Sequence, residues 1–178
     1  ILLHLLINMI PQVRCMGSGY VYHCPDCGEA TYIALGMGSD YTPERVFYGN
    51  DADPPLMKDF LSAAMYRTAD RLLRDGGVPD TAQNGSYGQK LYYCPQCRTL
   101  KVGFFCTIIH DDRCWTPQYT CDLCRHPLVL VPNQENGDDP SRDQMAGPDG
   151  AVLRICCKKC GRVYFAPESG CTSMFFWD

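Results

Sequence analysis

The sequence has little positive charge and no long hydrophobic run. Its 178 residues carry 16 Lys and Arg against 20 Asp and Glu, which gives a formal net charge of −4. Nucleic-acid binding by bulk electrostatics needs an excess of Lys and Arg that neutralises phosphates, so the overall charge argues against it and leaves only a local basic patch. The apolar run at residues 1–10 is too short to span a bilayer. We therefore expect no membrane association.

Motifs that mark common enzyme classes are also missing. The sequence contains no P-loop, no His-Glu-x-x-His motif, no nucleophile elbow and no zinc-deaminase signature. It has only four histidines, and His110-Asp111-Asp112 is best explained as a solvated hairpin turn. These absences leave a thiol-redox or hydrolytic enzyme as the weakest of the functional classes considered below.

Cysteine, in contrast, is abundant, at 13 residues. This density indicates either a disulfide framework in a secreted protein or metal binding in a reducing compartment. The odd total, the clustering and the lack of a convincing secretion signal favour metal in a reducing cytoplasm. Eight of these residues form four Cys-x-x-Cys pairs: Cys24/Cys27, Cys94/Cys97, Cys121/Cys124 and Cys157/Cys160.

Each pair is expected to form a knuckle, a tight turn that directs two thiolates at one point. Two knuckles complete a tetrahedral four-cysteine site, so the eight cysteines predict two structural Zn²⁺ ions with no open position for catalysis. Cys156 is a weaker alternative to Cys157. Iron is also held by paired knuckles, but only one knuckle here has the full CPxCG form, and zinc is favoured.

Two pairings of the knuckles are credible. In the nested one, the second and third pairs share a metal, and the first and fourth pairs share the other. In the sequential one, the first and second pairs share a metal, as do the third and fourth. Loop-closure cost grows slowly with loop length and decides little. The hairpin pattern between the second and third pairs favours the nested arrangement, which would bring the ends of the chain together.

The segments around the knuckles predict a small, β-rich α+β fold of zinc-ribbon hairpins with one inserted helix. Strand-like runs precede or follow each knuckle, as in Ala30–Leu35, and Leu100–Ile109 is expected to turn at residues 110–113 and return over Cys114–Thr120. Asp53, followed by two prolines, is the expected N-cap of a helix that ends near Asp75, before Gly76-Gly77.

These predictions give one domain over residues 16–178. It comprises a helical insertion (51–88), a ribbon (89–131) and a flexible acidic loop (132–150). Residues 1–15 are interpreted as a non-native or upstream extension, because Met16 opens a stretch typical of a protein start.

That stretch, MGSGYVYHCPDCGEATYIALGMG, resembles the opening of small uncharacterised bacterial zinc-ribbon proteins. These proteins begin MG-x-GY, carry a CxxCG knuckle and continue into a short apolar strand with a glycine-rich break. LYYCPQC resembles their second knuckle, so the similarity covers roughly 16–38 and 90–131. The resemblance implies a cytosolic zinc-ribbon protein and carries no established activity. Arginine follows Cys97 and Cys124, where glycine is common, and could alter those turns.

Three functional classes follow. The acidic charge, the saturated sites and the aromatic tail Phe175–Trp177 favour an interaction module that binds a protein partner, although docking of this tail onto the sheet is the simpler interpretation. The oligomeric state is not predicted. The alternative is a nucleic-acid-associated ribbon, and the third class is the enzyme named above. Candidate nucleic-acid or anion contacts lie beside the knuckles: Arg98, Lys101, Arg125, Lys158, Lys159 and Arg162.

Overall fold

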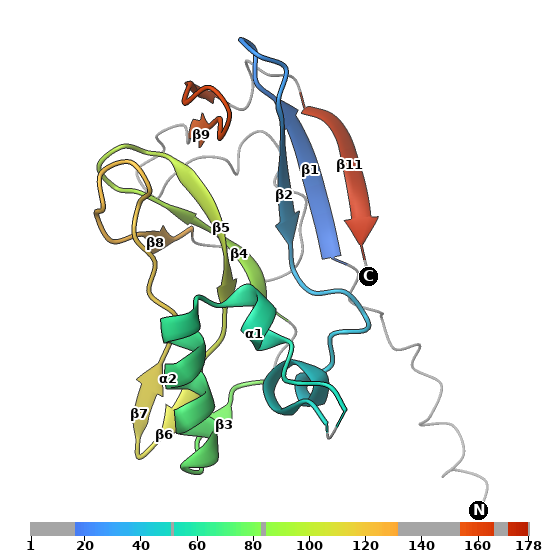
Figure 1. Ribbon diagram of the computed structural model, residues 1–178, viewed down its shortest axis with the longest axis vertical. Helices are drawn as coiled ribbons and strands as arrows, with labels where there is room; N and C mark the ends of the chain where they lie inside the picture. Colours follow the sequence, from blue (N-terminus) through green and yellow to red (C-terminus); the bar gives the residue numbers. More distant parts are fainter. Residues whose placement is uncertain (1–16, 51, 83–84, 132–153, 166–170, 178) are drawn as a thin grey trace, which may run out of the picture.

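The computed structural model describes residues 17–50, 52–82, 85–131, 154–165 and 171–177, the last of these by their backbone. The expected extension 1–15 and loop 132–150 lie outside the described residues. The described chain forms short antiparallel strands and short helices (Figure 1), which confirms the β-rich α+β class. Two small sheets stand side by side above a helical region.

The first sheet contains the strands that lead into and out of the first knuckle. Its order is β11-β1-β2, and all neighbours are antiparallel. The expected strand Ala30–Leu35 is confirmed as β2. β11 pairs along the length of β1, so the backbone of the aromatic tail does lie on the sheet, while its side chains are outside the described residues. The bounds are β1 (Gly17–His23), β2 (Ala30–Leu35) and β11 (Cys171–Trp177).

The second sheet, of order β5-β4-β8, carries the second knuckle at the tip of its β4–β5 hairpin. A separate two-stranded hairpin, β9–β10, carries the fourth knuckle and begins beside the second sheet, at an isolated bridge from Thr99 to Arg154. The bounds are β4 (Gly88–Tyr93), β5 (Leu100–Phe105), β8 (Val129–Leu130), β9 (Arg154–Cys156) and β10 (Val163–Phe165).

The prediction of one long strand over Leu100–Ile109 is wrong in one respect. The chain leaves the second sheet at the end of β5 and starts a new strand, β6, at Ile108. Cys106 is fully buried, and the chain turns there into a third sheet of order β3-β6-β7. The expected turn is confirmed, with positive φ angles of 48° and 58° at Asp111 and Asp112, as a tight hairpin turn requires. The return strand ends at residue 115, earlier than expected. The bounds are β3 (Val78–Pro79), β6 (Ile108–His110) and β7 (Arg113–Trp115).

The single helix expected over residues 53–75 is also corrected, because it is interrupted at Leu61. Leu61 has an extended backbone, and the Ser62 side chain accepts a hydrogen bond from the Met65 N–H, so Ser62 rather than Asp53 provides the side-chain cap. The interruption allows both Met57 and Leu61 to be buried in the same core. The helices are η1 (Glu44–Tyr48, a π-helical turn), α1 (Met57–Phe60) and α2 (Ala63–Arg74).

The hydrophobic core has separate clusters beneath the knuckle-bearing sheets and in the helical region. One buried cluster joins the first sheet, the second sheet and the β9–β10 hairpin, and includes Tyr22, Leu91, Val131, Ile155 and Tyr164. A second cluster packs the helices against Phe104, Cys106 and Ile108. The knuckles therefore lie toward one end of the molecule, and the helical region forms the other end (Figure 1).

Candidate metal centres

The eight knuckle cysteines form two clusters in the nested arrangement. We call Cys24, Cys27, Cys157 and Cys160 the outer centre, and Cys94, Cys97, Cys121 and Cys124 the inner centre. Facing sulfurs are 3.6 Å apart in the outer centre, from Cys24 to Cys160 and from Cys27 to Cys157. The corresponding distances in the inner centre are 3.5 Å. The nested expectation is confirmed, and Cys156 is not part of either cluster.

All four knuckles have the same backbone geometry. The N–H of the first cysteine donates to the carbonyl of the fifth residue after it, and the N–H of the fourth residue donates back to the first cysteine's carbonyl, all at 2.8–2.9 Å. The fourth residue has a positive φ in every case: Gly28 (69°), Arg98 (63°), Arg125 (62°) and Gly161 (75°). The two arginines therefore leave the turn unchanged, although a left-handed backbone is unfavourable for them.

The geometry and chemistry of the clusters suit a metal ion. Four thiolates around tetrahedral zinc, with Zn–S of about 2.3 Å, lie about 3.8 Å from one another. The sulfurs here are at comparable distances, and in each centre two are buried or nearly so and one is exposed. Each cluster could hold a metal ion, and the pair fits a structural zinc-binding module.

The thiols within each centre differ in acidity. In the outer centre, the N–H of Cys160, acting against burial, lowers the pKa of Cys157 to about 7. In the inner centre, burial opposes ionisation, but the N–H of Cys124 and the Thr99 hydroxyl lower the pKa of Cys121 to about 6. Hydrogen bonding with Cys124 and burial raise the pKa of Cys97. Four closely packed thiols cannot all ionise without a cation, so metal binding must release protons.

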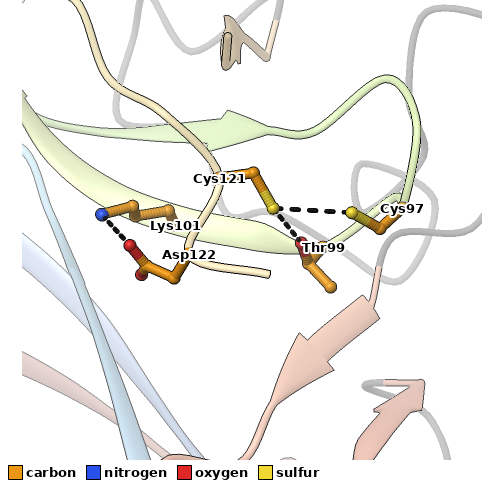
Figure 2. Close-up of polar contacts among 5 residues, drawn as sticks. All are labelled: Cys97, Thr99, Lys101, Cys121 and Asp122. Carbon is orange, nitrogen blue, oxygen red and sulfur yellow. Dashed lines mark hydrogen bonds and ion pairs between the residues drawn. The ribbon is translucent and has the colours of Figure 1, made fainter. Parts of the chain in front are cut away.

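Thr99 is a residue of the inner centre that the sequence analysis did not identify. Its hydroxyl lies 3.6 Å from the Cys121 sulfur, and Figure 2 shows this sulfur between Thr99 and Cys97. Beside it, Lys101 on β5 forms a 2.8 Å ion pair with Asp122 in the third knuckle. A side chain of the second knuckle's strand thus holds the third knuckle.

Ion pairs also join the knuckles of the outer centre. Arg162 lies 3.0 Å from Asp26, and Lys159 lies 3.6 Å from Glu29. Three of the six candidate contact residues, Lys101, Lys159 and Arg162, therefore face an acid within the protein. Of the others, Arg125 and Lys158 are exposed and Arg98 is half-buried. In the sequence, the acids of the first knuckle and the bases of the fourth are the pattern from which these ion pairs could have been predicted.

The other cysteines and histidines whose side chains the structure describes lie outside the clusters. Cys106 is fully buried, and burial raises its pKa to about 12. Cys114, at the middle of β7, is exposed. The His23 ring bonds the Gly28 carbonyl at 3.2 Å rather than a sulfur, and His110 bonds the Asp75 carbonyl at 3.1 Å. Among the described contacts, neither ring is hydrogen-bonded to a cysteine sulfur, so neither forms a thiol–imidazole pair.

A groove of about 480 Å³ lies between the two centres. Cys121 of the inner centre and Cys157 of the outer centre both line it, and its apolar floor includes the buried residues Leu91, Leu128 and Ile155. Its rim includes Tyr32 and Leu123, whose side chains are 67% and 52% exposed, and Lys158. The groove is therefore mostly apolar, with polar groups at its edges.

No protein-family model, no curated protein and no solved structure matches the sequence or the fold. Among the described residues, no helix has the length and apolar character needed to cross a membrane.

Proposed function

We propose that this protein is a structural zinc module without catalysis of its own, and that it binds a protein partner through the groove between the two centres. The observation that carries the proposal is the position of the groove. One ligand cysteine of each cluster, Cys121 and Cys157, lines it, so metal binding at either centre would affect its shape. A groove of this size is within the range that binds small ligands or a few side chains.

The lining indicates what kind of partner would fit. The apolar floor suits aliphatic or aromatic side chains, and the exposed Tyr32 and Leu123 would lose water-accessible apolar surface on binding. Lys158 lies on the rim, and none of the ion pairs between described residues includes it. We therefore propose a peptide segment that places apolar side chains in the groove and a carboxylate beside Lys158.

Zinc is the proposed ion because it accepts four thiolates in a closed tetrahedral site. Metal analysis of the purified protein should give two zinc ions per chain. A red protein with ferric–thiolate absorption would instead indicate iron. A cytoplasmic location and kinship with bacterial zinc-ribbon proteins are in keeping with this proposal, since both rest on reduced cysteines and CxxC knuckles.

Nucleic-acid binding is the second candidate, and it has less support. Three of the six basic residues beside the knuckles already face carboxylates, and the formal net charge is −4. Binding of random DNA or RNA at low salt, lost on Arg125→Gln and Lys158→Gln substitution, would favour this alternative. Lack of retention at low salt would remove it.

Peptide selection tests the groove directly. Peptides selected on the metal-loaded protein should share an apolar residue near an acidic one. They should bind Leu123→Asp and Lys158→Glu variants at least tenfold more weakly, while Tyr48→Ser, which alters a 54% exposed side chain outside the groove lining, serves as the matched control. Peptides that bind all three variants equally would show that the groove is not the docking site.

A further inference from the structure

Thr99 is unusual among the residues that the structure describes. Tyrosines and cysteines aside, it is the one buried polar or charged side chain in the described part of the chain, with 5% of its surface exposed. Buried hydroxyls need hydrogen-bond partners, because an unsatisfied polar group in the interior is costly. The Cys121 sulfur, 3.6 Å away, provides such a partner.

The backbone determines where this hydroxyl points. The Thr99 carbonyl accepts the Cys94 N–H at 2.9 Å, which closes the second knuckle, and Arg98 before it has a fixed left-handed conformation. The side chain therefore extends from the second knuckle to a sulfur of the third (Figure 2). When Cys121 binds metal as a thiolate, it has no proton to donate, so the hydroxyl must be the donor.

The other three knuckles have no counterpart. The residues in the same position, five after the first cysteine, are Glu29, His126 and Arg162. Glu29 and Arg162 form the exposed ion pairs of the outer centre, and His126 is exposed. A buried hydroxyl bonded to a ligand sulfur is thus a feature of the inner centre within the described chain.

We infer that Thr99 is a positioning residue that slows loss of the metal from the inner centre. A hydrogen bond donated to a coordinated sulfur draws electron density from its lone pairs and makes it less reactive toward protons and electrophiles. It also holds Cys121 in place relative to Cys97, 3.5 Å away. This inference rests on the proposed metal binding, and it makes the two centres kinetically different.

Site-resolved alkylation of the metal-loaded protein tests the inference. Peptide mass spectrometry would follow the reaction of the eight ligand cysteines with iodoacetamide in wild type, Thr99→Val, Thr99→Ser and a matched control, Thr107→Val. Wild type should lose outer-centre thiols first. Thr99→Val should accelerate the inner-centre thiols about fivefold, the effect of one hydrogen bond, while leaving the outer centre within about twofold. Thr99→Ser, which keeps the hydroxyl, and Thr107→Val should behave as wild type.

Cobalt substitution provides a readout that simple destabilisation would not change. Loss of the donated hydrogen bond raises the energy of the sulfur lone pairs, so the cobalt–thiolate charge-transfer band should move to lower energy in Thr99→Val and not in Thr99→Ser. If Thr99→Val does not fold, Thr99→Ala replaces it in both measurements.

Two different failures can be separated. Wild-type protein that binds two metal ions, with inner-centre rates and cobalt band unchanged in Thr99→Val, overturns the role of Thr99 alone. Equal acceleration at both centres does the same, since it indicates global destabilisation. Wild-type protein that binds no metal overturns the proposed function, and the inference falls with it.

Discussion

The outer and inner centres have the same four-sulfur chemistry but are assembled differently. The inner centre joins knuckles 24 residues apart, from Cys97 to Cys121, whereas the outer centre joins Cys27 to Cys157, 130 residues apart. The inner centre has arginine at its left-handed positions and a buried hydroxyl on sulfur; the outer centre has glycine at those positions and ion pairs at the surface. One fold thus builds one metal site from local contacts and another from long-range ones.

This difference suggests an order of dependence. The core beneath the outer centre includes Leu91 of β4 and Val131, which directly follows β8. In addition, the Arg154 N–H donates to the Arg98 carbonyl at 2.8 Å, so β9 starts on the second knuckle before it reaches Cys157. We therefore expect the outer centre to depend on the β5-β4-β8 sheet more than this sheet depends on the outer centre.

Metal removal should have the largest effect. Structural zinc contributes on the order of 10 kcal/mol per site in small zinc modules. A strong chelator should therefore abolish most β structure, in two steps with the outer centre first, as followed by circular dichroism and zinc release. Retention of the native spectrum after complete metal removal would contradict a structural role for both centres.

Single ligand substitutions should reveal the dependence between the centres. Cys157→Ser is expected to leave one metal ion per chain and native hydrogen-exchange protection in β4 and β5. Cys121→Ser should leave less than one, because the outer centre loses its support. The measurements are metal stoichiometry and amide exchange. A Cys121→Ser protein with one full ion and a protected β1–β2 hairpin would show that the centres are independent.

Acidification should also separate the centres. In each centre one thiol has a pKa below the ordinary value of 9.0: about 7 for Cys157 in the outer centre and about 6 for Cys121 in the inner centre. A lowered pKa stabilises the folded thiolate form above that pKa, and this contribution is lost as pH falls through it. We expect zinc to leave the outer centre at higher pH than the inner one. The Cys157→Ser variant, which keeps only the inner centre, identifies the later phase; release in the opposite order would contradict the assignment.

Exchange of arginine and glycine at the left-handed positions should have a smaller effect. Arg125→Gly should stabilise the protein by about 0.5–1 kcal/mol, because the left-handed backbone is costly for arginine. Gly161→Ala should destabilise it by about 1 kcal/mol through φ alone, since an added Cβ meets no atom within 4 Å. Zinc-loaded urea denaturation measures both. If Arg125→Gly did not stabilise the protein and Gly161→Ala did not destabilise it, the left-handed positions would not be strained.

The surface ion pairs should contribute least. Asp26 and Arg162 are 49% and 45% exposed, so their coupling should be about 0.2–1 kcal/mol and should vanish in high salt. A double-mutant cycle of Asp26→Asn and Arg162→Gln measures it. A coupling that persists at about 1 M salt would mean that the pair is more strongly shielded from water than its exposure indicates.

Much of this arrangement could be predicted from the sequence, and the failures have physical causes. The knuckles, β2 and the nested pairing followed from spacing and alternation, which are local signals. The break at Leu61 and the turn at Cys106 did not, because tertiary burial overrode helix and strand propensity at those residues. Thr99 was missed because a threonine after a knuckle looks like an ordinary strand residue until the third knuckle is placed against it.

The nested arrangement also determines the order in which the two metal sites can form during synthesis. At a synthesis rate of about 5–20 residues per second, the 130 residues between Cys27 and Cys157 take roughly 7–26 seconds to appear. During that time the first knuckle has no partner, while the second and third emerge in sequence and can close around an ion. The acids at Asp26 and Glu29 match Arg162 and Lys159, which are synthesised at least 130 residues later in each pair. We therefore expect the first knuckle to stay unpaired until the fourth is made, and the opposite charges beside the two knuckles to favour their association.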